Sequence, residues 1–248
     1  MKLADYTAKK NLLKDKSILV TGAAGGIGRA AARAFAEHGA TVIILDKNIP
    51  ALKLLYDQIK QDDLPEAAIY PMDLAGASVK DYETLEETLA KNFGKLDGLL
   101  HNAAILGSLS SISSYDLQQW QQVMTVNFNA PLLLTRACLS QLKASNSASV
   151  IFTSDTVGRK AKAYWGAYGI SKFATEGLMQ TLAEELDTNT SIRVNSIDPG
   201  PIKTLLRSAA YPGENPDQNP LPETIMDKYL YLMGDESQSI NGQKLSAQ

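Results

Sequence analysis

The sequence predicts an α/β fold in which a mostly parallel sheet of seven strands is covered by helices on both faces. Two observations support this fold class. Short apolar, β-branched runs alternate with longer helical stretches along the 248 residues, the pattern of parallel strands joined by crossover helices. A glycine-rich segment, residues 21–28, directly follows the first apolar run. Because such crossovers are right-handed, the predicted sheet is doubly wound.

The elements follow in order along the chain. The predicted strands are residues 17–21, 41–45, 67–71, 97–101, 148–153, 191–197 and 242–245. The predicted helices are residues 27–38, 50–61, 79–92, 115–144, 165–186 and 222–233. Helix-forming residues fill the first helix, and Gly39 ends it. The length fits a single domain over residues 1–248, with residues 1–16 as an N-terminal extension.

One irregular stretch interrupts the alternation. Residues 200–222 contain five prolines, and a loop of this length in a compact domain is usually functional or disordered. The stretch follows the C-terminal end of a predicted strand, where ligands bind in open α/β sheets. We therefore predict a substrate lid at residues 200–222.

Composition argues against several classes of function. The net charge is −3, and no block of lysine or arginine suggests nucleic-acid binding. Cys138 is the only cysteine, and His38 and His101 are the only histidines, so a metal site is not expected. The polar N-terminus lacks the apolar core of a signal peptide, and no apolar run is long enough to span a membrane. We expect a cytoplasmic protein without a membrane partner.

The glycines of residues 21–28 suggest a dinucleotide site. The strand, glycine turn, helix and second strand form a unit of about thirty residues, which is the context such a site needs. Gly22 would allow the tight turn, Gly26 the close approach of a pyrophosphate, and Gly28 the packing of helix on strand. The helix N-terminus would offer amide groups to the phosphates. The alternative is a glycine-rich connection that binds no ligand.

Asp46 at the end of the second predicted strand bears on which cofactor binds. A carboxylate there can accept hydrogen bonds from the adenosine ribose hydroxyls and would repel a 2′-phosphate, which favours NAD over NADP. Lys47 directly beside it could offset this preference, so NADP stays open. Alternatively, Asp46 only caps the next helix.

Tyr168 and Lys172 form the candidate catalytic pair. Residues at i and i+4 share one helix face, where an ammonium can stabilise a phenolate and let the tyrosine exchange a proton near neutral pH. The spacing alone is weak, because Tyr6 with Lys10 shows it as well. Ser154 lies fourteen residues before Tyr168, at the end of the fifth predicted strand. Each of these residues could instead be structural.

Several motifs in order resemble the short-chain dehydrogenase/reductase family, in its single-domain branch. They are the glycine turn, Asp73-Leu74, His101-Asn102-Ala103-Ala104, Asn127, Ser154, Tyr168-x-x-x-Lys172, and Pro199-Gly200 with Thr204. Within the family, Gly158-Arg159, the segment after Lys172 and Leu232-Met-Gly-Asp235 look like the YciK-type oxidoreductases of Gram-negative bacteria. The resemblance implies a Rossmann-type fold and an oxidoreductase that transfers hydride between a nicotinamide cofactor and a carbonyl or secondary alcohol.

The resemblance also implies roles for individual residues. Tyr168 would be the general acid/base, Lys172 would hold the phenolate and the nicotinamide ribose, and Ser154 would bind the substrate oxygen. Asn127 would kink its helix and hold a water that joins Lys172 to solvent. The implied cofactor contacts are Gly22, Ala24, Gly26, Ile27, Gly28, Asp46, Asp73, Leu74, Asn102, Ala103, Tyr168, Lys172, Pro199, Gly200, Ile202 and Thr204. His101 is expected to pack at a strand end rather than to act in catalysis.

The expected substrate side is mostly apolar. It comprises Ser154 with Leu106, Thr156, Trp165, Pro201, Leu205 and Tyr211, which suggests a hydrophobic or aromatic carbonyl compound or the matching alcohol. Apolar residues 130–134 are suited to subunit packing, and a homodimer or homotetramer is expected. Two other readings remain open: a dinucleotide-binding sensor or scaffold without turnover, and a sugar epimerase or dehydratase, for which the chain is short.

Overall fold

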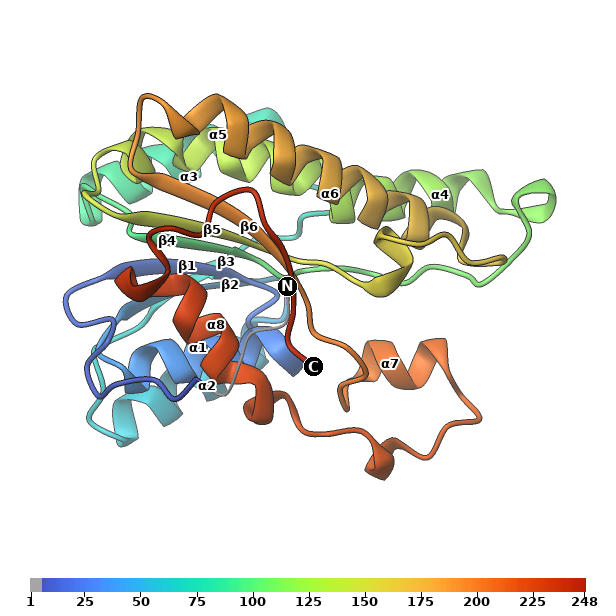
Figure 1. The fold of residues 1–248 in the computed structure, drawn as a ribbon, viewed down its shortest axis with the longest axis horizontal. Helices are drawn as coiled ribbons and strands as arrows, with labels where there is room; N and C mark the ends of the chain where they lie inside the picture. The colour runs from blue at the N-terminus through green and yellow to red at the C-terminus, as the bar shows by residue number, and fades with distance from the viewer. Residues whose placement is uncertain (1–5) are drawn as a thin grey trace.

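The computed structural model describes residues 6–248. Its seven strands form one sheet in the order β3-β2-β1-β4-β5-β6-β7, and every neighbouring pair is parallel (Figure 1). The strands are β1 Ser17–Thr21, β2 Thr41–Asp46, β3 Ala68–Pro71, β4 Gly98–His101, β5 Ala148–Thr153, β6 Ile192–Asp198 and β7 Lys244–Ser246. The predicted doubly wound α/β fold is confirmed, and the strand order reverses between β1 and β4.

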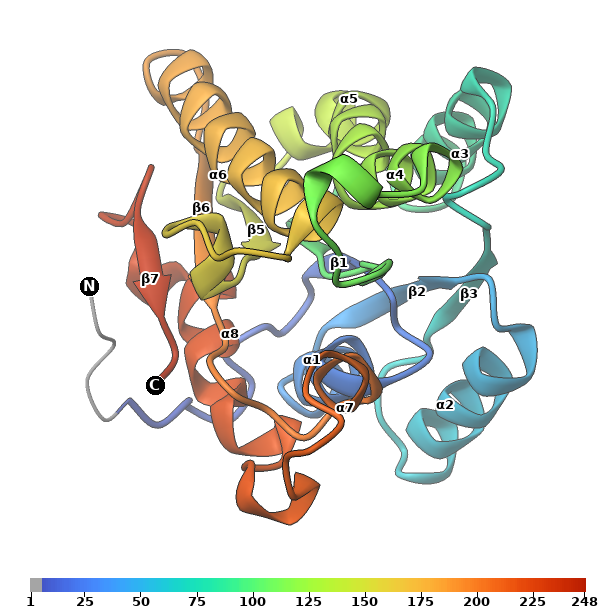
Figure 2. The same cartoon turned by 90° about the vertical axis from the view of Figure 1, so that its right-hand side faces the viewer.

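Helices cover both faces of this sheet (Figures 1 and 2). One layer consists of α1 Gly26–Glu37, α2 Ile49–Gln61 and α8 Met226–Met233. The other consists of α3 Val79–Asn92, α4 Leu117–Met124, α5 Ala130–Lys143 and α6 Gly166–Asp187. A short helix, α7 Leu205–Ala210, stands apart from both layers. The described part of the chain has no helix long and apolar enough to cross a membrane.

Each face of the sheet has its own hydrophobic core. Val20 and Ile44 belong to the cluster under α1, α2 and α8, whereas Leu19 and Leu45 belong to the cluster under α3, α5 and α6. Successive side chains of a strand point to opposite faces, so the continuous apolar runs read from the sequence are those of strands buried on both sides.

The predicted helix over residues 115–144 is divided. The α-helical segments α4 and α5 are separated by a π-helical segment, Thr125–Asn129. Pro131 explains the division, because it lacks the N–H that would bond the carbonyl of Asn127 in a regular α-helix. Instead, Thr175 Oγ1 donates to that carbonyl at 3.2 Å. Asn127, where a kink was expected, lies within this π segment.

The predicted lid, residues 200–222, has more structure than expected. Thr204 caps α7 by accepting a hydrogen bond from the Arg207 amide at 3.1 Å. Glu214 accepts two hydrogen bonds from Arg207, both at 2.7 Å. Lys203 pairs with Asp217 at 2.6 Å. These contacts fold the segment upon itself.

The two ends of the described chain are anchored. Within the predicted N-terminal extension, residues 1–5 lie outside the described residues, and Lys9 and Lys16 pair with Glu236 and Asp235. At the other end, Gln248 Nε2 donates to the carbonyls of Pro199 and Pro201 at 2.8 and 3.1 Å. The last residue thus holds the start of the predicted lid.

Candidate active site

A cavity of about 300 Å³ extends from the glycine turn to Tyr168. Most of the residues predicted to contact cofactor line it: Gly22, Gly26, Ile27, Asp46, Asn102, Ala103, Tyr168, Lys172, Pro199, Gly200, Ile202 and Thr204. Ala24, Gly28, Asp73 and Leu74 do not line it. Of these four, Leu74 is buried in the core beneath α3 and α5, and Asp73 is exposed, with its carboxylate accepting from Ala75 N at 3.1 Å.

The glycine turn is shaped for close backbone approach. Gly22 and Gly26 have positive φ angles of 68° and 51°, which L side chains rarely adopt. A Cβ on Gly28 would lie 2.2 Å from the carbonyl oxygen of Gly22. Helix α1 begins at Gly26, and its N-cap, Gly25, makes no side-chain cap. The first amides of α1 and its positive dipole end are thus left for an anion, so this cradle fits a dinucleotide pyrophosphate.

Asp46 at the end of β2 is already hydrogen-bonded. Its carboxylate accepts from Ala24 N at 3.2 Å and from Asn48 N at 2.9 Å. It therefore steadies the glycine turn as well as lining the cavity. Lys47 is exposed, and no hydrogen bond or ion pair involves its ammonium within residues 6–248.

Asn102 links β4 to the glycine turn. Its side-chain amide donates to the carbonyl of Thr21 at 3.3 Å, and its backbone N–H donates to Thr21 Oγ1 at 3.0 Å. The neighbouring His101 is 5% exposed, stacks on Phe152 and contacts Thr135 Oγ1 through Nε2 at 2.9 Å. The prediction that His101 packs at a strand end is confirmed.

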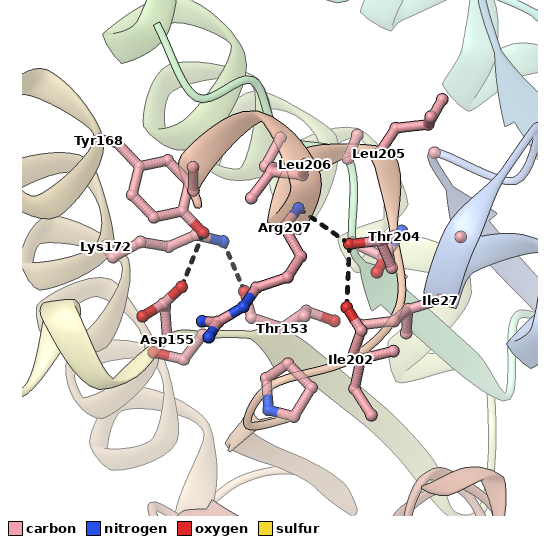
Figure 3. A pocket seen from close by; sticks show the side chains of 18 of the residues that line it. Ile27, Thr153, Asp155, Tyr168, Lys172, Ile202, Thr204, Leu205, Leu206 and Arg207 are labelled. Carbon is pink, nitrogen blue, oxygen red and sulfur yellow. Dashed lines mark hydrogen bonds between the residues drawn. The ribbon is translucent and has the colours of Figure 1, made fainter. Parts of the chain in front are cut away.

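Tyr168 and Lys172 lie one turn apart on α6, both almost fully buried. Lys172 Nζ lies 5.6 Å from the centroid of the Tyr168 ring and donates to the carbonyl of Thr153 at 2.7 Å (Figure 3). Burial lowers the pKa of Lys172 to about 8, against the opposing charges of Asp155, Glu176 and Asp198. The two residues do share one helix face, as their spacing predicts.

Asp155 is the group that contacts the Tyr168 hydroxyl. The phenol donates to Asp155 Oδ2 at 3.1 Å (Figure 3). Burial and then the charge of this carboxylate raise the pKa of Tyr168 well above its ordinary value. This direction is opposite to the one that a stabilised phenolate would require. Sequence reasoning missed Asp155, although it directly follows Ser154 and lies thirteen residues before Tyr168.

The hydroxyl of Ser154 has a different partner. Ser154 Oγ donates to Glu176 Oε1 at 2.5 Å, and the residue is 2% exposed. Glu176 is also paired with Arg159 at 2.9 Å and accepts from Ser196 at 2.8 Å. Ser154 lines the cavity, but no hydrogen bond joins its hydroxyl to that of Tyr168 among the described residues. Glu176 was likewise absent from the predicted site.

Asn127 sits in the π segment and fixes a neighbouring loop. Its side chain accepts from Ile105 N and donates to Ile105 O, both at 2.9 Å, and it donates to Ser171 Oγ at 3.0 Å. Asn127 does not line the cavity. Its contacts join the loop after β4 to the turn of α6 between Tyr168 and Lys172.

The substrate side combines aromatic and charged residues. Trp165 packs against Tyr168 and Tyr211, with ring centroids 5.7 Å apart in both pairs, and Leu106 packs on this cluster. Lys162 Nζ lies 5.4 Å from the ring centroid of Trp165. Leu205, although at the cavity rim, is 92% exposed. The cavity is also lined by residues that the sequence did not indicate, among them Asp155, Leu206, Arg207 and Ala210.

A second cavity of about 330 Å³ adjoins the first. Asp155, Gly200, Arg207 and Tyr211 line both. Thr156 and Pro201, which were expected on the substrate side, line only the second cavity, where Thr156 Oγ1 donates to Asp198 at 2.7 Å.

The parallel sheet, the glycine cradle and the buried Tyr–Lys pair define a short-chain dehydrogenase. The sequence profile of that family, described as short chain dehydrogenase, matches residues 16–215, and the chain belongs to this family. Among curated relatives, the uncharacterized oxidoreductase YciK of Escherichia coli K12 is 44% identical over 98% of this chain and 96% of its own length.

Solved structures agree with this assignment. A short chain dehydrogenase structure from Pseudomonas syringae is 53% identical, with a TM-score of 0.97 and coverage of 99% of this chain and 100% of that one. A short chain dehydrogenase from Escherichia coli CFT073, complexed with NADPH, is 44% identical, with a TM-score of 0.94 and coverage of 97% and 100%. The expected resemblance to the YciK-type oxidoreductases is thus confirmed.

Proposed function

We propose that this protein is an NADP(H)-dependent oxidoreductase that interconverts a carbonyl compound and its secondary alcohol. The main support is the convergence, in one cavity, of the glycine cradle at the N-terminus of α1 with Tyr168 and Lys172 of α6. A cradle for phosphates and a buried proton-exchanging group meet at the carboxyl ends of the strands, where ligands bind in such sheets.

The cofactor preference departs from the sequence-based expectation of NAD. The relative from Escherichia coli CFT073 was solved with NADPH, and NAD as the main cofactor has no such support. In this chain the Asp46 carboxylate is engaged by two backbone amides, and the exposed Lys47 is placed next to it. We infer that the Lys47 ammonium contacts the 2′-phosphate and offsets the charge of Asp46.

Each side chain of the site would have its own role in the reaction. The cofactor, when bound, supplies or accepts the hydride. Tyr168 exchanges a proton with the substrate oxygen. Lys172, fixed by the carbonyl of Thr153, holds the tyrosine and the ribose. The Asn127 side chain orients the Ile105 loop and the α6 turn. Its backbone carbonyl would accept a hydrogen bond from a relay water, beside the one from Thr175.

The Ser154 hydroxyl donates to Glu176 and must give up that hydrogen bond before it can donate to the substrate oxygen. The aromatic cluster of Trp165 and Tyr211, with Leu206 and Ala210, favours a substrate with an apolar or aromatic body. Arg207 and Lys162 add positive charge beside it, although Arg207 is matched by Glu214.

A second candidate is a binder of nicotinamide nucleotide that does not turn over. The observation in its favour is the Asp155 carboxylate beside Tyr168, which opposes formation of a phenolate.

One assay separates the oxidoreductase from the non-catalytic binder. Apolar ketones are tested for NADPH oxidation, and the matching alcohols for NADP⁺ reduction. The oxidoreductase predicts turnover that falls at least about a hundredfold in Tyr168→Phe, with NADPH affinity retained. NADPH binding without turnover of any pair would support the non-catalytic binder instead.

A further inference from the structure

The Asp155 carboxylate has one oxygen anchored and one oxygen directed at the reacting group. Oδ1 accepts from Val157 N at 3.0 Å and caps the 3-10 turn Thr156–Gly158. Oδ2 accepts from the Tyr168 hydroxyl at 3.1 Å (Figure 3). The cap fixes the carboxylate in place, so its contact with the phenol is set by the backbone.

The other acidic groups near Tyr168 have their oxygens occupied. Asp198 accepts from Thr156 Oγ1 at 2.7 Å and from Gly200 N at 2.9 Å. Glu176 accepts from Ser154, Arg159 and Ser196. Asp155 is the carboxylate that bonds the Tyr168 hydroxyl, the atom that exchanges a proton with substrate in the proposed function.

Asp155 also has a route to solvent. It is half-buried and lines both the cofactor cavity and the adjoining cavity of about 330 Å³. The charged groups around it are Lys172 from α6, Asp198 from β6, Arg207 from α7, and Lys160 and Lys162 from the loop before α6. A proton taken up by Asp155 can therefore leave through the second cavity without crossing the core.

We propose that Asp155 is a catalytic residue of this protein, the carboxylate that exchanges a proton with the Tyr168 hydroxyl during turnover. The inference rests on the proposed function. In alcohol oxidation, the alcohol O–H proton passes to the Tyr168 oxygen as the tyrosine proton passes to Asp155 Oδ2, and the hydride leaves the alcohol carbon for NADP⁺. The products are the ketone, NADPH and protonated Asp155. Reduction is the reverse.

This arrangement solves a difficulty that the carboxylate itself creates. An ionised carboxylate stabilises the protonated phenol, so Tyr168 is a poor base by itself. Transferring the tyrosine proton to Asp155 in the same step avoids a free phenolate beside a negative charge. The buried Lys172 ammonium, 5.6 Å from the ring, stabilises any negative charge on the phenol oxygen during the transfer.

The first test is a titration of Tyr168 in the NADPH-bound protein, by NMR of ring-labelled tyrosine with Tyr168→Phe for assignment. Asp155→Asn and Asp155→Ser can both still cap the turn at Val157, so folding is preserved. We expect each to lower the pKa of Tyr168 by at least about one unit. The matched control is Asp198→Asn, which removes a carboxylate that makes no hydrogen bond to the phenol. It should shift the pKa of Tyr168 by less than half as much.

The second test is the pH profile of alcohol oxidation with NADP⁺, on the most active pair of the ketone and alcohol panel. Asp155→Asn should lower kcat by about a hundredfold and move the acidic limb of the profile, whereas KM for NADP⁺ should stay within about threefold.

The outcomes separate the two proposals. Wild-type turnover with an unchanged kcat and pH profile in Asp155→Asn would overturn the role of Asp155 and leave the oxidoreductase assignment intact. Absence of wild-type turnover on every pair, with NADPH bound, would overturn the oxidoreductase assignment and the catalytic role together. An unchanged Tyr168 titration in both Asp155 variants would show that the carboxylate does not act on the phenol, and would also overturn the inference.

Discussion

The Ser154 hydroxyl donates a 2.5 Å hydrogen bond to the buried carboxylate of Glu176. Glu176 is 3% exposed in its side chain and is also the ion-pair partner of Arg159. The end of β5, the 3-10 turn that follows it and helix α6 are therefore joined through one carboxylate directly behind the proposed catalytic groups.

Glu176→Gln should destabilise the protein markedly, because it leaves the Arg159 guanidinium without its counter-charge in a mostly buried position. We expect a loss of about 3 kcal/mol in the free energy of unfolding, measured by chemical denaturation. Glu37→Gln is the control: it breaks the exposed i, i+4 pair with Arg33 and should cost no more than about 0.5 kcal/mol. Equal costs for the two variants would contradict this account of the buried network.

Gly28→Ala should disrupt the cofactor cradle. The added methyl would lie 2.2 Å from the Gly22 carbonyl oxygen and 2.6 Å from Asn102 Nδ2, so the turn or α1 must move. Affinity for NADPH should fall by at least about tenfold and Tm should fall with it. Gly177→Ala, on an exposed turn of α6 with nothing within 4 Å of its Cβ, should instead stabilise the protein by about 0.5–1 kcal/mol. Unchanged NADPH affinity in Gly28→Ala would argue against this cradle as the phosphate site.

His101 should make stability depend on pH. Burial lowers the pKa of His101 to about 3 in the folded protein, whereas an unfolded histidine titrates near pH ~6.5. Between these values the unfolded chain binds a proton that the folded chain does not. This contribution to stability is fully present above pH ~6.5 and is lost as pH falls towards 3, at up to about 1.4 kcal/mol per pH unit.

The check is chemical denaturation at several pH values between about 4 and 7. His101→Gln should flatten the dependence, and His38→Gln should retain it. If the free energy of unfolding of His101→Gln still depended on pH to the same extent, the dependence would arise from other groups.

The exposed residues of α6 bear on the expected homodimer or homotetramer. Ile170 and Phe173 are 44% and 42% exposed on this helix, and large exposed apolar side chains often mark subunit contacts. We predict a mass of at least two chains by light scattering, reduced to one chain in Phe173→Glu. A monomeric wild-type protein would contradict the expectation.

Sequence patterns predicted most of the strands and helices because capping residues, glycines and prolines lie at the ends of these elements. Strands β1 and β5 and helix α3 have the predicted ends, and α3 begins at a capping box formed by Ser78 and Asp81. The division between α4 and α5 was missed although Pro131 signals it, since one lost backbone hydrogen bond leaves the apolar pattern intact. In the lid, Thr204 signals α7 through its cap, but the proline-rich context obscured that signal.

The sequence indicated those site residues whose spacing lies within a single element, namely the glycine turn and the Tyr168–Lys172 pair. The pairing of Tyr168 with Asp155, and of Ser154 with Glu176, depends on how β5 and α6 pack against each other. Adjacent residues at a strand end point in different directions, so sequence spacing did not distinguish Ser154 from Asp155 as the neighbour of the phenol.

The cavity between the glycine turn and Tyr168 is the proposed site of NADP(H). Calorimetric titration of the wild-type protein with NADPH and, separately, with NADH tests it most directly. We expect NADPH to bind at least about tenfold more tightly than NADH, and Lys47→Ala to remove most of this difference. Tighter binding of NADH would restore Asp46 as the ribose ligand and contradict the assignment to NADP(H), and binding of neither nucleotide would contradict the site itself.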